Sequence, residues 1–156
     1  MRLTPPSRGR PAGGPPLTSN VSHLIMIQQA EVMQLLLEAC PTFSGACAKH
    51  VQEYGNDLLY VAAGELAVHL LRVYESGDHS SLSAAGKAIE QLHVNGSPWV
   101  KEFATIGILE GIQNAWANNH VDPERFLPFL GPESQRWWGG LNKFWSGQVP
   151  HVRADG

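Results

Sequence analysis

A glutamate and a histidine one helical turn apart are the residues in this sequence best placed to do chemistry. Glu65 and His69 stand four positions apart in a stretch with helical periodicity, so their side chains share one flank of the predicted helix. A carboxylate and an imidazole in this arrangement can bind a metal ion or act as an acid–base pair. Glu110 is the candidate third ligand. Together the three residues form a candidate metal site or hydrolase centre.

The same residues also have a purely structural interpretation. Arg72 follows His69 by three positions, and a Glu–His–Arg row on a helix surface stabilises the helix by only about 0.2–0.5 kcal/mol per pair. Further metal ligands would have to come from His50 or His93, and neither belongs to a zinc motif. We favour the structural interpretation and expect no bound metal.

Three polar residues are expected to be partly buried, and they are Glu65, Glu110 and Asn114. Glu110 and Asn114 lie on one edge of a helix whose other positions are mostly apolar. A buried carboxylate normally has a partner. We therefore weigh two interpretations of Glu110: a carboxylate at the core edge bonded to a neighbouring helix or to solvent, or a functional group.

No motif identifies a catalytic residue or a cofactor. The chain has no phosphate loop, dinucleotide fingerprint, zincin motif or nucleophile elbow. Cys40 and Cys47 fit no common zinc spacing, and we expect two buried thiols, although helices folded back on each other would permit a disulfide. We expect no cofactor, and we favour a protein that is not an enzyme.

The C-terminal part of the chain carries a cluster of aromatic residues. Four of them, Trp137, Trp138, Phe144 and Trp145, fall in one predicted helix. Trp138, Leu141 and Trp145 share a face of that helix, and Trp137, Phe144 and Asn142 cannot all share it. Either all four pack in the core, or some stay exposed and bind a partner or a second copy. The four are therefore partner-binding candidates.

The stretch 98–118 is predicted to be the central helix. Apolar residues surround most of it, which is typical of a helix buried on several sides. Ser97 is a suitable N-cap, and Pro98 suits the first helical position. A narrow face of small residues predicts a second helix at close range, since glycines in a helix otherwise destabilise it. That face consists of Ala104, Gly107, Gly111 and Ala115.

The other periodic stretches also predict helices, and no run alternates for long enough to make a strand. Short loops favour antiparallel neighbours, so the sequence predicts an all-α fold, a compact antiparallel bundle of about six to seven helices. A short α-solenoid is the structural alternative, although no repeat of fixed period is present. The expected helices span residues 27–40, 44–54, 58–75, 81–94, 98–118, 124–130 and 133–145.

Both ends of the chain are expected to lie outside the folded domain. Residues 1–25 are rich in Pro, Gly and Arg and bury too little apolar surface to offset the entropy of ordering. They predict a disordered tail, or alternatively sequence ahead of a true start at Met26. A single helical domain is expected over 26–146, followed by a frayed tail over 147–156.

Composition excludes several classes of partner. The 156-residue chain has a net charge of −3 and 16% charged residues, with no basic stripe for nucleic acid. No apolar run is long enough to cross a membrane, and the N-terminus lacks the apolar segment of a secretory signal. We expect a cytoplasmic protein that binds a protein partner or itself, and neither nucleic acid nor membrane.

Two runs carry a recognisable pattern. The first, GELAVHLLRVYESGD, opens with Gly64 and Glu65. The second, VKEFATIGILEGIQN, contains Thr105, Gly107, Leu109, Glu110, Gln113 and Asn114. Over roughly residues 27–120 the chain resembles a bacterial family of small helical proteins known only as a domain of unknown function. The resemblance implies a small helical cytoplasmic protein and brings no established activity.

We therefore favour a non-enzymatic bacterial interaction protein that binds a protein partner, similar in general character to toxin-neutralising immunity proteins. The absence of catalytic motifs, the mild acidity and the aromatic segment favour this hypothesis. One alternative is a small metal-binding protein or hydrolase that uses Glu65, His69 and Glu110. The other is a homo-oligomeric structural module joined through the tryptophans.

Overall fold

The fold is all-α, as the sequence predicted. The structure, a computed structural model, describes residues 26–54 and 59–155. Within these residues lie seven α-helices, α2 to α8, joined by 3-10 turns and by one π-helical segment. The described part contains no strand, and its β-type pairing is a single bridge between Ile27 and Gly96. The predicted tail over 1–25 lies outside the described residues, which begin at Met26.

One long helix runs through the centre of the molecule. It consists of α6 (Pro98–Glu102), the π-helical segment η4 (Phe103–Leu109) and α7 (Glu110–Asn118). Ser97 caps it, since its hydroxyl accepts a hydrogen bond from the backbone N–H of Val100 at 3.3 Å. The helix therefore has the predicted bounds, but its middle turns are wider than those of an α-helix.

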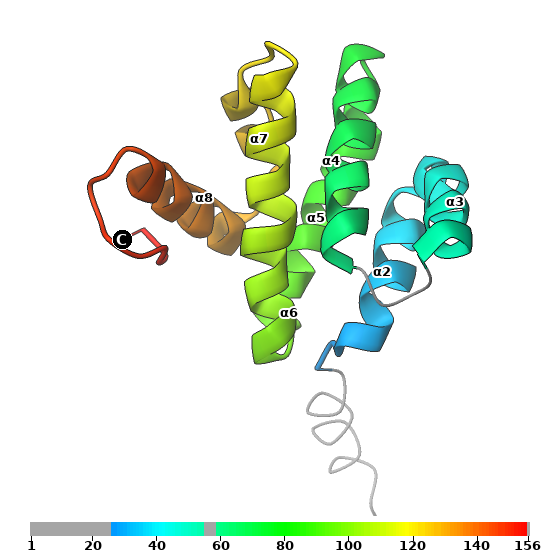
Figure 1. Cartoon of the computed structure of the whole chain (residues 1–156), viewed down its shortest axis with the longest axis horizontal. Helices are drawn as coiled ribbons and strands as arrows, with labels where there is room; N and C mark the ends of the chain where they lie inside the picture. The colour runs from blue at the N-terminus through cyan, green and yellow to red at the C-terminus, as the bar shows by residue number, and fades with distance from the viewer. Residues whose placement is uncertain (1–25, 55–58, 156) are drawn as a thin grey trace, which may run out of the picture.

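Two antiparallel helices flank the centre. α4 (Leu59–Glu75) runs beside α6 and α7, and α5 (His79–Asn95) passes behind them (Figure 1). A methyl group added at Gly111 would lie 3.7 Å from the carbonyl oxygen of Ala63 and 3.8 Å from the Cβ of Ala67. The small-residue face therefore receives α4 at close range, as expected.

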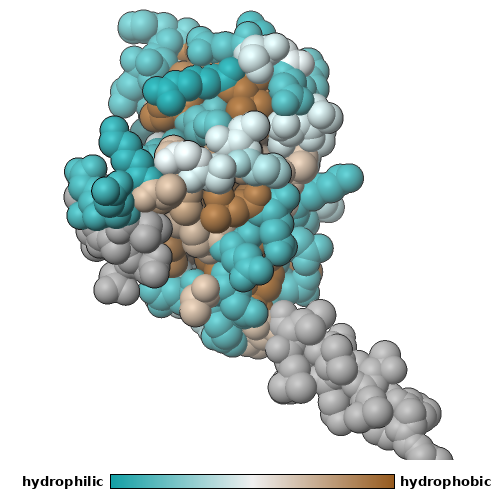
Figure 2. Space-filling model, turned by 90° about the vertical axis from the view of Figure 1, so that its right-hand side faces the viewer, coloured by the Kyte–Doolittle hydropathy of each residue, from teal (hydrophilic) through white to brown (hydrophobic). Residues whose placement is uncertain are grey.

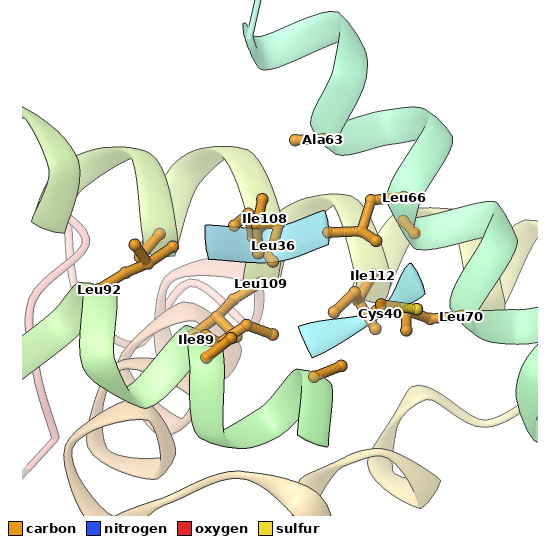
Figure 3. Close-up of a cluster of buried hydrophobic side chains, with 14 of the residues drawn as sticks. Leu36, Cys40, Ala63, Leu66, Leu70, Ile89, Leu92, Ile108, Leu109 and Ile112 are labelled. Carbon is orange, nitrogen blue, oxygen red and sulfur yellow. The ribbon is translucent and has the colours of Figure 1, made fainter. Parts of the chain in front are cut away.

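The core lies where these helices meet. Figure 3 shows aliphatic side chains from α2, α4, α5 and the central helix directed into one cluster. The indole N–H of Trp116, in the fully buried part of α7, donates to the backbone oxygen of Ala67 in α4 at 3.1 Å. That bond satisfies a buried donor and fixes the two helices together. Members of the cluster are Leu36, Leu66, Leu70, Ile89, Leu92, Ile108, Leu109 and Ile112.

The N-terminal helices cover one side of this core. They are η2 (Gln29–Glu31), α2 (Val32–Ala39), η3 (Pro41–Phe43) and α3 (Ser44–Tyr54). α2 packs on α5, and the 3-10 turn that begins at Pro41 separates it from α3, since the residue before a proline leaves the α region. The surface on this side alternates between polar and apolar patches (Figure 2). None of the helices in the described residues is long and apolar enough to cross a membrane.

The C-terminal helix α8 (Pro132–Trp145) packs on the opposite side, against α5 and η4 (Figure 1). The helix predicted over 124–130 is instead two 3-10 turns, η5 (Pro123–Arg125) and η6 (Leu127–Phe129). Gly86 of α5 receives η6, because a Cβ there would lie 1.9 Å from the Phe129 carbonyl oxygen.

The segment 147–155 lies against α8, and the expectation of a frayed tail was wrong. The backbone N–H of Asp155 donates to the Arg136 carbonyl oxygen at 2.8 Å, and its side chain pairs with Lys143. A Cβ on Gly140 would lie 1.6 Å from the carbonyl oxygen of Arg153. The glycine therefore opens the surface of α8 to the segment, a contact that helical periodicity does not reveal.

Candidate functional site

The structure does not bring Glu65, His69 and Glu110 together as a metal-binding group. His69 Nε2 lies 2.8 Å from the Thr42 hydroxyl of η3. Burial, and then the charge of Arg72, lowers the pKa of His69. Glu110 is half-buried elsewhere, on the central helix, where burial raises its pKa. Among the described residues, no three His, Cys, Asp or Glu side chains are grouped closely enough to hold a metal ion.

The three polar residues expected to be partly buried have different environments. Glu65 and Glu110 are half-buried, whereas Asn114 is exposed. The wide turns of η4 explain the exposure of Asn114, because a projection at α-helical spacing across a π-helical segment misplaces the residues that follow. The buried polar residues of the described chain are His93, Ser97, Thr105, Gln113 and Ser134.

Three of these residues, His93, Thr105 and Ser134, form a hydrogen-bonded chain with the half-buried Glu90, and we call the four the His93 network. His93 is 3% exposed, with its Nδ1 2.8 Å from the Ser134 hydroxyl and its Nε2 2.9 Å from the Thr105 hydroxyl. The Ser134 hydroxyl donates to Glu90 Oε1 at 2.8 Å. The carboxylate also accepts the backbone N–H groups of Ser134 at 2.9 Å and Glu133 at 3.1 Å. The network thereby joins α5, η4 and the first turn of α8.

Hydrogen-bond chemistry determines which group donates and which accepts at each bond of the His93 network. A carboxylate only accepts, so the single hydroxyl proton of Ser134 goes to Glu90. Ser134 must then accept the Nδ1–H of His93, which leaves Nε2 to accept the Thr105 hydroxyl proton. Burial lowers the pKa of His93 to about 4, consistent with a neutral imidazole. For Glu90, burial raises the pKa, but the hydrogen bonds from Ser134 and Glu133 outweigh it and the net pKa is lowered.

A cleft of about 500 Å³ opens beside this network, between the first half of the central helix and α8. Such a volume suits a small ligand or a large side chain. Thr105 belongs to its floor, and the exposed charges of Lys101 and Glu102 lie on its wall. The apolar lining residues are Pro98, Ile106, Trp137 and Val152.

Thr105, in the floor of the cleft, and its partner His93 are better suited to hold the shape of the cleft than to transfer protons. A histidine with a pKa of about 4 is a weak base at neutral pH. Thr105 is 3% exposed, and its hydroxyl proton is held by His93. π-helical segments are frequent at functional sites, and η4 places both Thr105 and Ile106 at this cleft.

The four aromatic candidates of α8 have different environments. Trp138 is buried in the core, and its indole N–H donates to Glu124 at 2.6 Å, which removes it from any partner surface. It shares the inward face with the buried Leu141. Trp137 lines the cleft, whereas Trp145 is 54% exposed with the Phe144 ring 5.2 Å away.

A second aromatic group, which the sequence did not single out, lies where α4 begins beside α6. The Tyr60 ring meets Trp99 edge-on at 6.0 Å and Phe103 at 5.1 Å, and Trp99 stacks on Phe103 at 5.3 Å. Burial raises the pKa of Tyr60, and the nearby charges of Glu102 and Glu110 raise it further. We call Tyr60, Trp99, Glu102 and Glu110 the acidic aromatic ledge.

Comparison with known proteins identifies a family. A family model described as "Domain of unknown function (DUF7674)" matches residues 33–146. The match runs from α2 through α8 and contains the His93 network and the acidic aromatic ledge. It extends beyond the resemblance noted in the sequence, which ended near residue 120. No curated protein and no solved structure gives a significant match.

Proposed function

This chain belongs to the DUF7674 family, and we propose that it is a non-enzymatic interaction protein whose cleft between the central helix and α8 holds an apolar side chain of a protein partner. The observation that carries the proposal is the cleft itself: about 500 Å³, with a largely apolar wall and a fixed floor. An immunity-like role, with a toxin as the partner, is one form of this function.

The lining of the cleft supports a protein side chain as occupant. Ile106 and Val152 are half-buried, and Trp137 presents a large flat surface at little cost in rotamer entropy. Tryptophans are enriched among the residues that dominate binding energy at protein interfaces. Lys101 and Glu102 give the apolar lining a polar border, the usual anatomy of an interface.

The His93 network supports binding over catalysis. Its hydroxyls are committed to partners inside the protein, and a neutral, weakly basic His93 is poorly suited to activate either of them at neutral pH. The network instead holds η4 and α8 at a fixed separation. A preformed cleft binds more tightly than one that must be ordered on binding.

The test is site-specific photo-crosslinking in the native host. p-Benzoylphenylalanine replaces Val152 on the cleft wall or, as the matched control, the exposed Val94 of α5. We expect the probe at Val152 to capture a protein of a different sequence, and the probe at Val94 not to capture it. The substitution Ile106→Glu in the same chain should abolish the adduct, because it places a charge in the apolar cleft.

Two results would reject the proposal. The first is that the probe at Val152 captures no protein. The second is an adduct between two copies of this chain. It would favour the homo-oligomeric module, and the exposed Trp145 and its neighbour Phe144 are the candidate contact residues for that module.

A further inference from the structure

We propose that the acidic aromatic ledge binds an arginine side chain of the partner, next to the apolar side chain held in the cleft. This inference rests on the proposed function and names the chemistry of the partner: an apolar residue with an arginine close to it. The ledge lies on the central helix and the start of α4, and Glu102 belongs both to it and to the cleft wall.

The rings of the ledge leave aromatic surface open. Tyr60 is 44% exposed although it contacts Trp99 and Phe103, and Trp99 is half-buried. Phe103 is buried beneath them and holds both rings, by an edge-on contact with Tyr60 and by stacking with Trp99. The next residue of α4, Val61, is also exposed, at 45%.

The charges of the ledge are acidic. Glu102 is exposed and Glu110 half-buried, and both act on Tyr60. Among the described residues, neither carboxylate has a hydrogen bond or a salt bridge. Burial raises the pKa of Glu110, so its charge is already partly deprived of water. A cation brought to this position would therefore be attracted more strongly than one at a fully hydrated carboxylate.

Arginine fits this combination better than other cations. Its guanidinium is planar, so one face can stack on Tyr60 or Trp99 while the N–H groups reach a carboxylate. Lysine offers a compact, strongly hydrated charge that makes poorer use of two flat rings. Because Glu102 lines the cleft and its charge also acts on Tyr60, a residue beside the apolar anchor can reach the ledge.

The experiment is a two-dimensional ¹⁵N–¹H NMR titration of the full chain, observing the indole N–H signals of Trp99 and Trp137. The probes are acetyl-Leu-Arg-amide and acetyl-Leu-citrulline-amide, which differ in charge but hardly in shape. We expect the arginine peptide to shift the Trp99 signal with at least about fivefold higher affinity than the citrulline peptide. A lysine peptide should fall between them.

Variants then assign the charge. Glu110→Gln should weaken binding of the arginine peptide by about two- to fivefold, as expected for loss of one partly exposed carboxylate. Glu75→Gln is the matched control, because it makes the same change at an exposed residue at the end of α4, whereas Tyr60 lies at the start of that helix. It should leave binding unchanged.

The outcomes separate this inference from the proposed function. Equal affinity for the two peptides, or an unchanged affinity in Glu110→Gln, overturns the arginine site, even if Trp137 responds to both peptides and the Val152 probe still captures a partner. Conversely, if Trp99 responds selectively to the arginine peptide but the Val152 probe captures nothing, the ledge chemistry stands and the partner-binding function fails.

Discussion

Two histidines in this molecule each lie within hydrogen-bond distance of a threonine hydroxyl, yet their surroundings differ. His69 Nε2 is 2.8 Å from Thr42, on the half-exposed side of α4 that faces η3. His93 Nε2 is 2.9 Å from Thr105, inside the protein, with a second bond from its other nitrogen to Ser134. Spacing in the sequence drew attention to His69, because a glutamate stands one turn before it. The structure gives the larger role to His93, whose partners are distant in sequence.

The difference shows that the contribution of a hydrogen bond to stability depends on how deeply its donor and acceptor are buried. A solvent-exposed hydrogen bond exchanges readily for one with water, so its net contribution is small. A buried donor or acceptor that loses its partner has no water to replace it, which costs about 1–3 kcal/mol per group. The His93 network contains several such groups and joins three elements. We therefore expect it to govern both stability and the shape of the cleft.

The largest expected effect is that of His93→Ala. The change removes the hydrogen-bond partner of the Thr105 hydroxyl and one of the two partners of the Ser134 hydroxyl. It also creates a cavity between α5, η4 and α8. We expect the free energy of unfolding to fall by about 3–4 kcal/mol, measured by urea denaturation. A loss below 1 kcal/mol would show that the network is not what holds these elements together.

Stability should also depend on pH through His93. Its pKa falls from 6.5 to about 4 on folding, so the folded state binds the proton more weakly than the unfolded state. The contribution of the neutral His93 to the free energy of unfolding is therefore fully present above pH 6.5, and it is lost progressively as the pH falls towards about 4. The loss should be on the order of 3 kcal/mol.

The measurement is urea denaturation at a series of pH values, with His93→Gln as the reference. His69 also has a lowered pKa, so it contributes in the same direction in both proteins and cancels in the comparison. The difference between wild type and His93→Gln should shrink as the pH falls from 6.5 to 4. A difference that stays constant over this range would mean that His93 titrates normally in the folded protein.

Local patterns were sufficient to predict most helices, because periodicity and capping act within one element. α3 and the central helix have the predicted bounds, and Ser97 is the predicted cap. The network could not be predicted in this way. Ser134 is 41 positions from His93, and only the packing of α8 on α5 brings them together. Likewise, nothing in the sequence marks η4 as π-helical, so the expectation that Asn114 is partly buried was not met.

A smaller effect is expected from Glu90→Gln, which tests the outer end of the network. The carboxylate accepts three hydrogen bonds, including the backbone N–H groups of Glu133 and Ser134 at the start of α8. An amide can keep one acceptor oxygen but turns its nitrogen towards a donor. We therefore expect the free energy of unfolding to fall by about 1–2 kcal/mol. Amide hydrogen exchange of Glu133 and Ser134 should accelerate. The exposed Glu75→Gln is the control and should change neither quantity.

The smallest effect is expected at His69, and it decides whether the comparison between the two histidines holds. His69→Gln keeps a polar group near the Thr42 hydroxyl, and the site is reachable by water. The free energy of unfolding should therefore change by less than about 0.5 kcal/mol in urea denaturation. Thr42→Val in the same assay should be equally mild, because it removes the other half of the same bond. If either variant were as destabilising as His93→Ala, η3 and α4 would depend on this contact as strongly as α8 depends on His93, and the contrast between the two histidines would be wrong.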